Sequence, residues 1–86
     1  MLTKLKQKDF DKVFMIMEDS FPKDEYRTYE KQKALLDDER YMIYIIPDGE
    51  EVKAFIAVWQ FDEFAFVEHF AVNQTYRNQG LGSIIL

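Results

Sequence analysis

The 86-residue sequence predicts an α/β fold with elements in the order β-α-α-β-β-β, followed by a loop and the start of another helix. Three observations predict it. Apolar residues recur at spacings of three and four between residues 10 and 21, which is the period of an amphipathic helix. Three apolar runs of strand length then follow at residues 41–46, 52–61 and 64–72. Two glycines one residue apart precede a short apolar segment at the end of the sequence.

The N-terminal part of the sequence is expected to form a short strand and two helices. Residues 2–6 alternate between apolar and polar side chains, as a strand with one covered face does. Asp9 stands where a helix N-cap is expected, and Pro22 ends the apolar stripe that follows. Asp24 is a candidate N-cap for a second, more polar helix running through residues 35–36. Because the apolar face of this helix is thin, we expect it at the surface or at the rim of a site.

The three apolar runs predict consecutive strands joined by short turns. Residues 47–50 combine a proline, which fixes φ, with a glycine, which permits positive φ, so they predict a turn. Residues 62–63 are acidic and predict the next turn. The run 52–61 is apolar on both faces, and we expect such a strand to be covered on both sides of its sheet.

The composition narrows the class of protein and the class of partner. Hydrophobic residues make up 48% of the sequence and aromatic residues 16%, which is enough for one packed domain. The net charge of −5 argues against a nucleic-acid partner, because phosphate binding needs clustered lysine and arginine. The absence of cysteine excludes a disulfide framework, a thiolate metal site and a cysteine nucleophile. No signal peptide or membrane span is predicted, so we expect a cytoplasmic protein with no membrane partner.

The order strand, polar loop, glycines and helix near the end of the sequence predicts an anion-binding loop. Gly80 and Gly82 lack a Cβ, so the backbone there can approach phosphate oxygens closely. The N-terminus of the predicted helix adds a partial positive charge. The loop has no Gly-Lys-Ser/Thr ending, which disfavours a Walker loop. It also does not follow the first strand of a βαβ unit, which disfavours a Rossmann fingerprint.

Two motifs make the sequence similar to the N-terminal half of the GNAT family of N-acetyltransferases. The first is Glu-His-Phe-Ala-Val at residues 68–72, at the end of the last predicted strand. The second is Arg-Asn-Gln-Gly-Leu-Gly at residues 77–82, which matches the family's Gln/Arg-x-x-Gly-x-Gly/Ala acetyl-CoA signature. The resemblance implies a mixed, mostly antiparallel sheet. Residues 1–86 are then expected to be the N-terminal portion of a single acetyltransferase domain, truncated before its C-terminal half.

The resemblance also implies the reaction, which is direct transfer of an acetyl group from acetyl-CoA to a primary amine of a small molecule or peptide, without a metal. The backbone of the last strand would pair with the pantetheine arm at Phe70, Ala71 and Val72. The loop would wrap the pyrophosphate with main-chain N–H groups of Arg77, Asn78, Gln79, Gly80, Leu81 and Gly82. The usual general acid of the family is a tyrosine of the missing half, so no residue here is assigned that role.

Glu68 is the candidate catalytic residue, and two interpretations of it are open. Glu68 alternates in register with Phe64, Phe66, Phe70 and Val72. We therefore expect its carboxylate on an apolar face, where desolvation would raise its pKa. It would then act as a base for the acceptor ammonium, directly or through water, and family members often use an acid at this place. The alternative is a structural carboxylate bonded to the backbone or to an arginine. His69 is expected to point to the opposite face and to be a packed or surface residue.

Tyr26, Arg27 and Tyr29 are candidates for the wall of the acceptor pocket, because the first two helices usually supply it in the family. The other interpretation is that they form an ordinary helix rim.

A non-catalytic module is the alternative function. A strand as apolar as residues 64–72 without a neighbour would present unpaired backbone groups, and such edges recruit other strands. This hypothesis predicts weak CoA binding, self-association through that strand, or a complementing C-terminal fragment.

Overall fold

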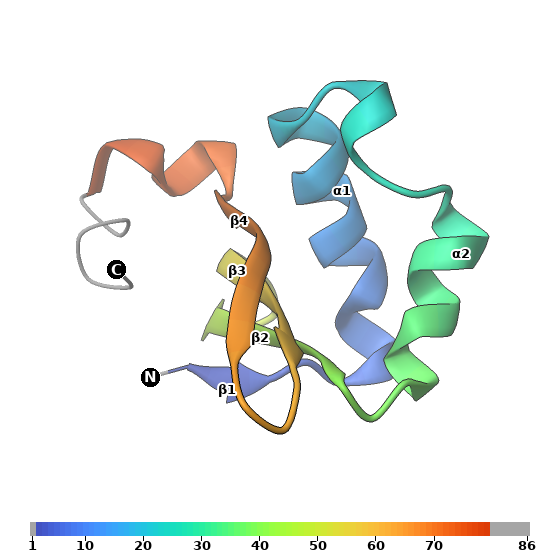
Figure 1. Cartoon of the computed structure of the whole chain (residues 1–86). Coiled ribbons are helices and arrows are strands. Elements are labelled where there is room, and N and C mark those ends of the chain that lie inside the picture. The colour runs from blue at the N-terminus through green and yellow to red at the C-terminus, as the bar shows by residue number, and fades with distance from the viewer. Residues whose placement is uncertain (1, 80–86) are drawn as a thin grey trace.

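The computed structural model describes residues 2–79 and shows one antiparallel sheet with two helices packed on it (Figure 1). The strands lie in the order β1-β2-β3-β4, which is also their order in the chain. They are β1 (Thr3–Lys4), β2 (Tyr41–Asp48), β3 (Glu51–Gln60) and β4 (Ala65–Val72), and the helices are α1 (Phe10–Ser20) and α2 (Tyr29–Ala34). The predicted β-α-α-β-β-β order is confirmed. The helix predicted after Gly82 lies outside the described residues.

Helix α1 forms where the apolar stripe predicts it and supplies the helical side of the core. Asp9 is its N-cap residue by position, but the carboxylate makes no capping hydrogen bond and lies 3.6 Å from the Lys12 ammonium. The helix ends at Ser20, and its C-cap residue, Phe21, is extended because Pro22 follows it. Its buried side chains, one stripe at spacings of three and four, are Phe10, Val13, Phe14, Ile16 and Met17.

The second helix begins later than predicted. Asp24 lies in a 3-10 turn, Lys23–Glu25, and α2 starts only at Tyr29 with Thr28 as its N-cap. The Thr28 hydroxyl accepts a hydrogen bond from the backbone N–H of Lys31 at 3.4 Å. Thr28 takes the place predicted for Asp24, because the extended segment before it carries side chains to the core and to β4.

The core lies between α1 and one face of the sheet. Its strand residues come mainly from alternating positions of β2 and β3: Tyr41, Ile43, Ile45, Val52, Phe55, Ala57 and, from β4, Ala71. Both helices cover this same face (Figure 1), so the cover predicted for the second face of β3 is not supplied by α1 or α2. Within residues 2–79 no helix is long and apolar enough to cross a membrane.

A register shift in the β3–β4 pair shapes the edge of the sheet. Ala57 pairs with His69 and Val58 pairs with Val67, so Glu68 has no Cα partner on β3. Glu68 is therefore the extra residue of a β-bulge, which bends a strand and redirects its side chains. In the described part of the chain β4 is an edge strand, and the bulge lies near its middle.

Candidate active site

The bulge in β4 brings Glu68 and His69 to one cavity. This cavity, called the β4 cavity below, has a volume of about 510 Å³ and is lined by Phe21, Asp24, Glu25, Tyr26, Arg27, Glu68 and His69. Its walls come from β4 and from the segment between α1 and α2. The prediction that His69 points away from Glu68 is wrong, because two neighbouring residues at a bulge no longer alternate between faces.

The same bulge changes which β4 residues share a face. His69 and Ala71 are buried on the face that the helices cover, with 7% and 6% of their surface exposed. Since side chains alternate beyond the bulge, Phe70 and Val72 lie on the opposite face. The predicted register of Glu68 with these two residues is therefore wrong, although its alternation with Phe66, before the bulge, is unaffected.

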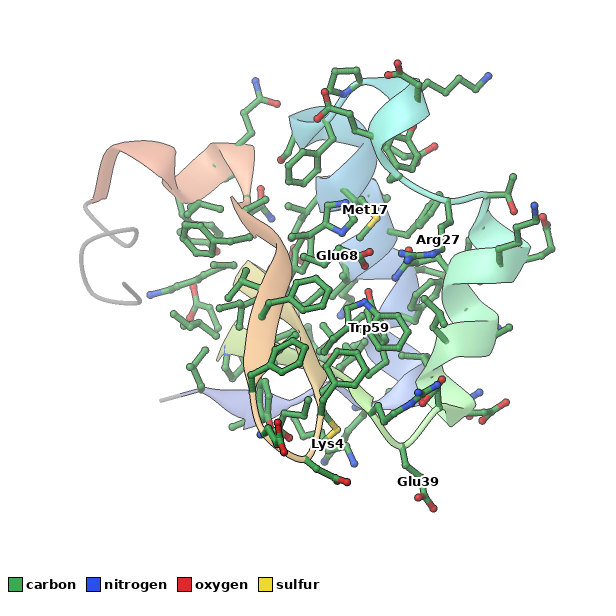
Figure 2. All side chains as sticks on the ribbon, in the orientation of Figure 1. Lys4, Met17, Arg27, Glu39, Trp59 and Glu68 are labelled. Atoms are coloured by element: carbon green, nitrogen blue, oxygen red, sulfur yellow. The ribbon has the colours of Figure 1, made fainter. Side chains whose placement is uncertain are left out.

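Arg27 holds the Glu68 carboxylate in a two-pronged ion pair (Figure 2). Arg27 Nη1 donates to Glu68 Oε1 at 2.8 Å, and Nη2 donates to Oε2 at 2.7 Å. The side chains of Arg27 and Glu68 are 32% and 23% exposed, so the pair lies at the border between protein and solvent. Planar guanidinium and carboxylate groups fit each other in this arrangement, which fixes the position of both.

The ion pair lowers the pKa of Glu68 below its usual value of 4.5. The hydrogen bonds from Arg27 are the largest cause, and they outweigh partial burial, which acts in the opposite direction. The expectation that desolvation raises this pKa is therefore wrong in sign. The alternative of a carboxylate bonded to an arginine describes the observed contact, and Glu68 is ionised at neutral pH.

A buried amide continues the network behind Arg27. Arg27 Nη1 also donates to the side-chain oxygen of Gln32 at 3.3 Å, and Gln32 in turn donates to the Tyr41 hydroxyl. Gln32 is fully buried, and burial raises the pKa of Tyr41 to about 12. These contacts connect α2 and β2 to the arginine and limit the directions in which it can move.

The His69 ring is held from two sides. Its Nε2 lies 2.9 Å from the backbone oxygen of Glu25, and the ring of Phe21 meets it edge-on with centroids 4.9 Å apart. Its Nδ1 lies 3.7 Å from Glu68 Oε1 and has no hydrogen-bond partner. His69 is thus an ordered residue whose second nitrogen is buried without a hydrogen bond.

The two candidate tyrosines have different positions. Tyr26 lines the β4 cavity, and its ring meets that of Phe14 edge-on at 5.8 Å. Tyr29 is not among the residues that line this cavity. Its ring packs edge-on against Phe10 and Phe14, both at 5.3 Å, and its hydroxyl donates to Asp11.

The predicted cofactor residues are described only in part. Phe70, Ala71 and Val72 end the edge strand β4. The backbone of Arg77, Asn78 and Gln79 belongs to a 3-10 helix, Gln74–Gln79, where a loop was expected. Gly80, Leu81 and Gly82 lie outside the described residues.

The bulge, the partner of Glu68 and the contacts of Gln32 and His69 were not predicted from the sequence. A pairing between residues 41 positions apart leaves no local pattern in the sequence. Gln32 had a weak signal, because a polar residue three positions after Tyr29 falls on the same helix face.

The chain is similar to a family of known proteins. The model of the acetyltransferase (GNAT) family matches residues 4–86. A solved structure from Bacteroides thetaiotaomicron, assigned to the same family, is 32% identical with a TM-score of 0.86, and the match covers 99% of this chain and 51% of that one. No curated protein matches the chain.

Two more distant structures share the fold. The ribosomal-protein-S18-alanine N-acetyltransferase of Escherichia coli is 24% identical with a TM-score of 0.76, and the match covers 98% of this chain and 52% of that one. An aminoglycoside acetyltransferase from an uncultured soil sample, solved with sisomicin, is 14% identical with a TM-score of 0.71, and the match covers 98% and 62%. The chain spans about half the length of the first solved structures it matches. Since the family match extends over almost the whole sequence and the described fold agrees with it, the chain belongs to the GNAT family of acetyltransferases.

Proposed function

We propose that this protein is an acetyl-CoA-dependent N-acetyltransferase whose acceptor, a primary amine of a small molecule or peptide, binds in the β4 cavity. The observation that carries the proposal is the charge of the cavity wall. Asp24, Glu25 and Glu68 line it together with one cation, Arg27, which is already paired with Glu68. Such a wall attracts a protonated amine and repels an anionic acceptor.

Glu68 is proposed to contact the acceptor directly. An ionised carboxylate accepts hydrogen bonds from an ammonium group, and Arg27 keeps this carboxylate ionised and oriented. Its low pKa makes it a good binding group and a weak base. Acetyl transfer further requires that the ammonium lose a proton, since only a neutral amine has the lone pair that attacks the thioester carbon. The carbon–sulfur bond then breaks, and the thiolate leaves with the electron pair.

The cofactor is proposed to bind along β4 and the segment that follows it. Support comes from the family membership and from the position of β4 at the edge of the described sheet. The backbone of residues 70–72 would pair with the pantetheine arm, and the main chain of residues 77–82 would surround the pyrophosphate. The cytoplasmic location stays a prediction.

Calorimetric titration of acetyl-CoA into the 86-residue chain tests the cofactor part of the proposal. Saturable binding is expected, and Gly80→Asp should abolish it, because the change adds a side chain and a negative charge at a position proposed to contact the pyrophosphate. Absence of binding by the folded chain would contradict a cofactor site formed by these residues.

The acceptor part of the proposal is tested with butylamine as the acceptor. The rate of its acetylation is measured from the free thiol of coenzyme A that the reaction releases. Glu68→Gln should reduce the rate at subsaturating amine by about 100-fold, since the neutral amide keeps the shape but loses the charge. Glu63→Gln is the matched control, because Glu63 is an exposed carboxylate that does not line the β4 cavity. Equal rates for the two variants would exclude Glu68 from the acceptor site.

The alternative, a module that associates through β4, is favoured by one observation. Phe64, Phe66 and Val67 are 60%, 46% and 51% exposed at the edge strand and the turn before it. Exposed apolar edges pair with other strands. This alternative predicts that the sedimentation of the wild-type chain depends on its concentration and that Val67→Lys abolishes this dependence. A monodisperse wild-type monomer would contradict it.

A further inference from the structure

His69 lines the β4 cavity and has a buried ring nitrogen, Nδ1, without a hydrogen-bond partner. The backbone oxygen of Glu25 lies 2.9 Å from His69 Nε2. A carbonyl oxygen has no hydrogen to donate, so Nε2 must carry the ring proton in this contact. In a neutral imidazole the other nitrogen then keeps its lone pair. The contact with Glu25 thus fixes the tautomer and leaves Nδ1 as an acceptor.

This acceptor is buried and lacks a partner. His69 is 7% exposed, and its Nδ1 makes no hydrogen bond. Glu68 Oε1 is 3.7 Å away, which is too long for a hydrogen bond, and a carboxylate oxygen could not donate one. Buried polar atoms are nearly always hydrogen-bonded in native proteins. Because His69 lines the β4 cavity, its buried, unpartnered Nδ1 is a position where a donor from a ligand is expected.

The two acceptors are spaced for one ammonium group. Glu68 Oε1 and His69 Nδ1 lie 3.7 Å apart and belong to side chains that line the same cavity. A primary ammonium has three N–H donors directed to different sides, so it can donate to both at once. A quaternary ammonium carries the same charge but has no N–H to donate.

We propose that His69 Nδ1 accepts a hydrogen bond from the acceptor ammonium and then takes its proton, which makes His69 a catalytic residue of this site. The inference rests on the function proposed above. In this step one N–H bond of the ammonium breaks and its electron pair stays on the amine nitrogen, while a new N–H bond forms at Nδ1. The resulting imidazolium lies beside the ionised Glu68, which stabilises its charge.

Glu68 and His69 have different roles in this step. Arg27 lowers the pKa of Glu68, so this carboxylate binds a cation well but accepts a proton poorly at neutral pH. The imidazole has no such partner on Nδ1. Among the described residues that line the cavity, His69 is the one with an imidazole, and the lone pair of its Nδ1 is not engaged in a hydrogen bond.

Nitrogen NMR of the histidine ring tests the inference without acetyl-CoA. Because the sequence has one histidine, ¹⁵N-histidine labelling gives a single pair of ring signals. Two-bond proton–nitrogen correlations should show the proton on Nε2 and a bare Nδ1. Butylammonium at about pH 8, where alkylamines remain protonated, should move the Nδ1 signal toward the hydrogen-bonded range. Tetramethylammonium should leave it unchanged. A proton on Nδ1 in the free chain, or no response of Nδ1 to butylammonium, would overturn the inference.

Two variants separate this role from a structural one. In His69→Gln the side-chain NH₂ can still donate to the Glu25 carbonyl, while no acceptor remains at the position of Nδ1, so butylammonium should bind about fivefold more weakly. In His69→Asn the amide oxygen occupies the place of Nδ1, so amine binding should be retained while acetyl transfer slows by at least tenfold. Binding can be followed by the fluorescence of Trp59, the one tryptophan, which contributes to the environment of Glu68. If both variants keep wild-type transfer rates, His69 has no part in the reaction.

The outcomes also distinguish this inference from the proposed function. Acetyl-CoA binding and butylamine acetylation without an Nδ1 response would reject the role of His69 and keep the acetyltransferase. An Nδ1 response without acetyl-CoA binding would keep the amine site and reject the proposed reaction.

Discussion

Two arginine–carboxylate pairs in this molecule share their chemistry and differ in what they do. Arg27 bonds both oxygens of Glu68 at 2.8 and 2.7 Å across 41 positions of the chain. Arg40 bonds both oxygens of Asp38 at 3.3 and 3.2 Å, only two positions away. The Arg27 side chain is 32% exposed and that of Arg40 is 61% exposed.

The difference shows that the surroundings of an ion pair determine what it contributes to stability and to the site. The Asp38 pair closes a turn in solvent, where such contacts contribute little to stability. The Glu68 pair joins the segment before α2 to the bulge of β4, and the two sides of the β4 cavity meet there. It has less contact with water, and its geometry fixes the carboxylate that the proposed acceptor contacts.

Removal of Arg27, the arginine of the pair that spans 41 positions, should give the largest loss of stability. Arg27→Ala is expected to lower the free energy of unfolding by about 2 kcal/mol, because two charge-assisted hydrogen bonds are lost and a half-buried carboxylate is left unpaired. Urea denaturation followed by circular dichroism measures the change. A loss no larger than that of Arg40→Ala would remove the distinction between the two pairs.

Arg27→Lys should have an intermediate effect. Lysine keeps the charge but lacks the planar fork, so one of the two hydrogen bonds to Glu68 is lost and the free energy of unfolding should fall by about 1 kcal/mol. The same denaturation experiment reports it. A value equal to that of Arg27→Ala would mean that the two-pronged geometry, and not the charge, carries the whole contribution.

Acid should weaken the contribution of Arg27. The pKa of Glu68 is lowered on folding, so its stabilisation is present above its usual value of 4.5 and is lost as pH falls through the lower, folded value. The stability difference between wild type and Arg27→Ala should therefore shrink below pH 4.5. The pKa of Asp38 is lowered too, by Arg40, so the comparison is best made in an Arg40→Ala background. A difference that grows on acidification would contradict the sign.

Arg40→Ala should have the smallest effect. Its contact is exposed and local, and the Asp38 carboxylate can exchange it for water. The denaturation midpoint is expected to stay within the error of the measurement, and a clear shift would show that this turn contributes more than its geometry indicates.

Most of the fold could be predicted from the sequence because its signals are local. The stripe of α1 and the three long strands were predicted within two residues of their observed ends. Turn residues 47–50 were also informative, since Gly49 has a φ of +62°. The start of α2 was predicted wrongly, because the contacts of Tyr26 and Arg27 outweigh the capping preference of Asp24.

The site was less predictable because it depends on a single extra residue in β4. Alternation placed Glu68 on one apolar face with Phe66 and Phe70, but the bulge reverses every assignment after it, from His69 to Val72. A bulge is determined by how two strands pair, and no residue of β4 marks it in advance. The direction of the Glu68 pKa shift was predicted wrongly for a related reason, since Arg27, which causes the shift, lies on a different element.

The most direct test of the account is a carboxyl ¹³C titration of Glu68, assigned by comparison with Glu68→Gln, with and without butylammonium. We predict that the pKa of Glu68 lies below its usual value of 4.5, and that butylammonium lowers this pKa further because it binds the ionised form. A titration at or above 4.5, or one that butylammonium does not change, would contradict an ionised carboxylate that binds the acceptor amine.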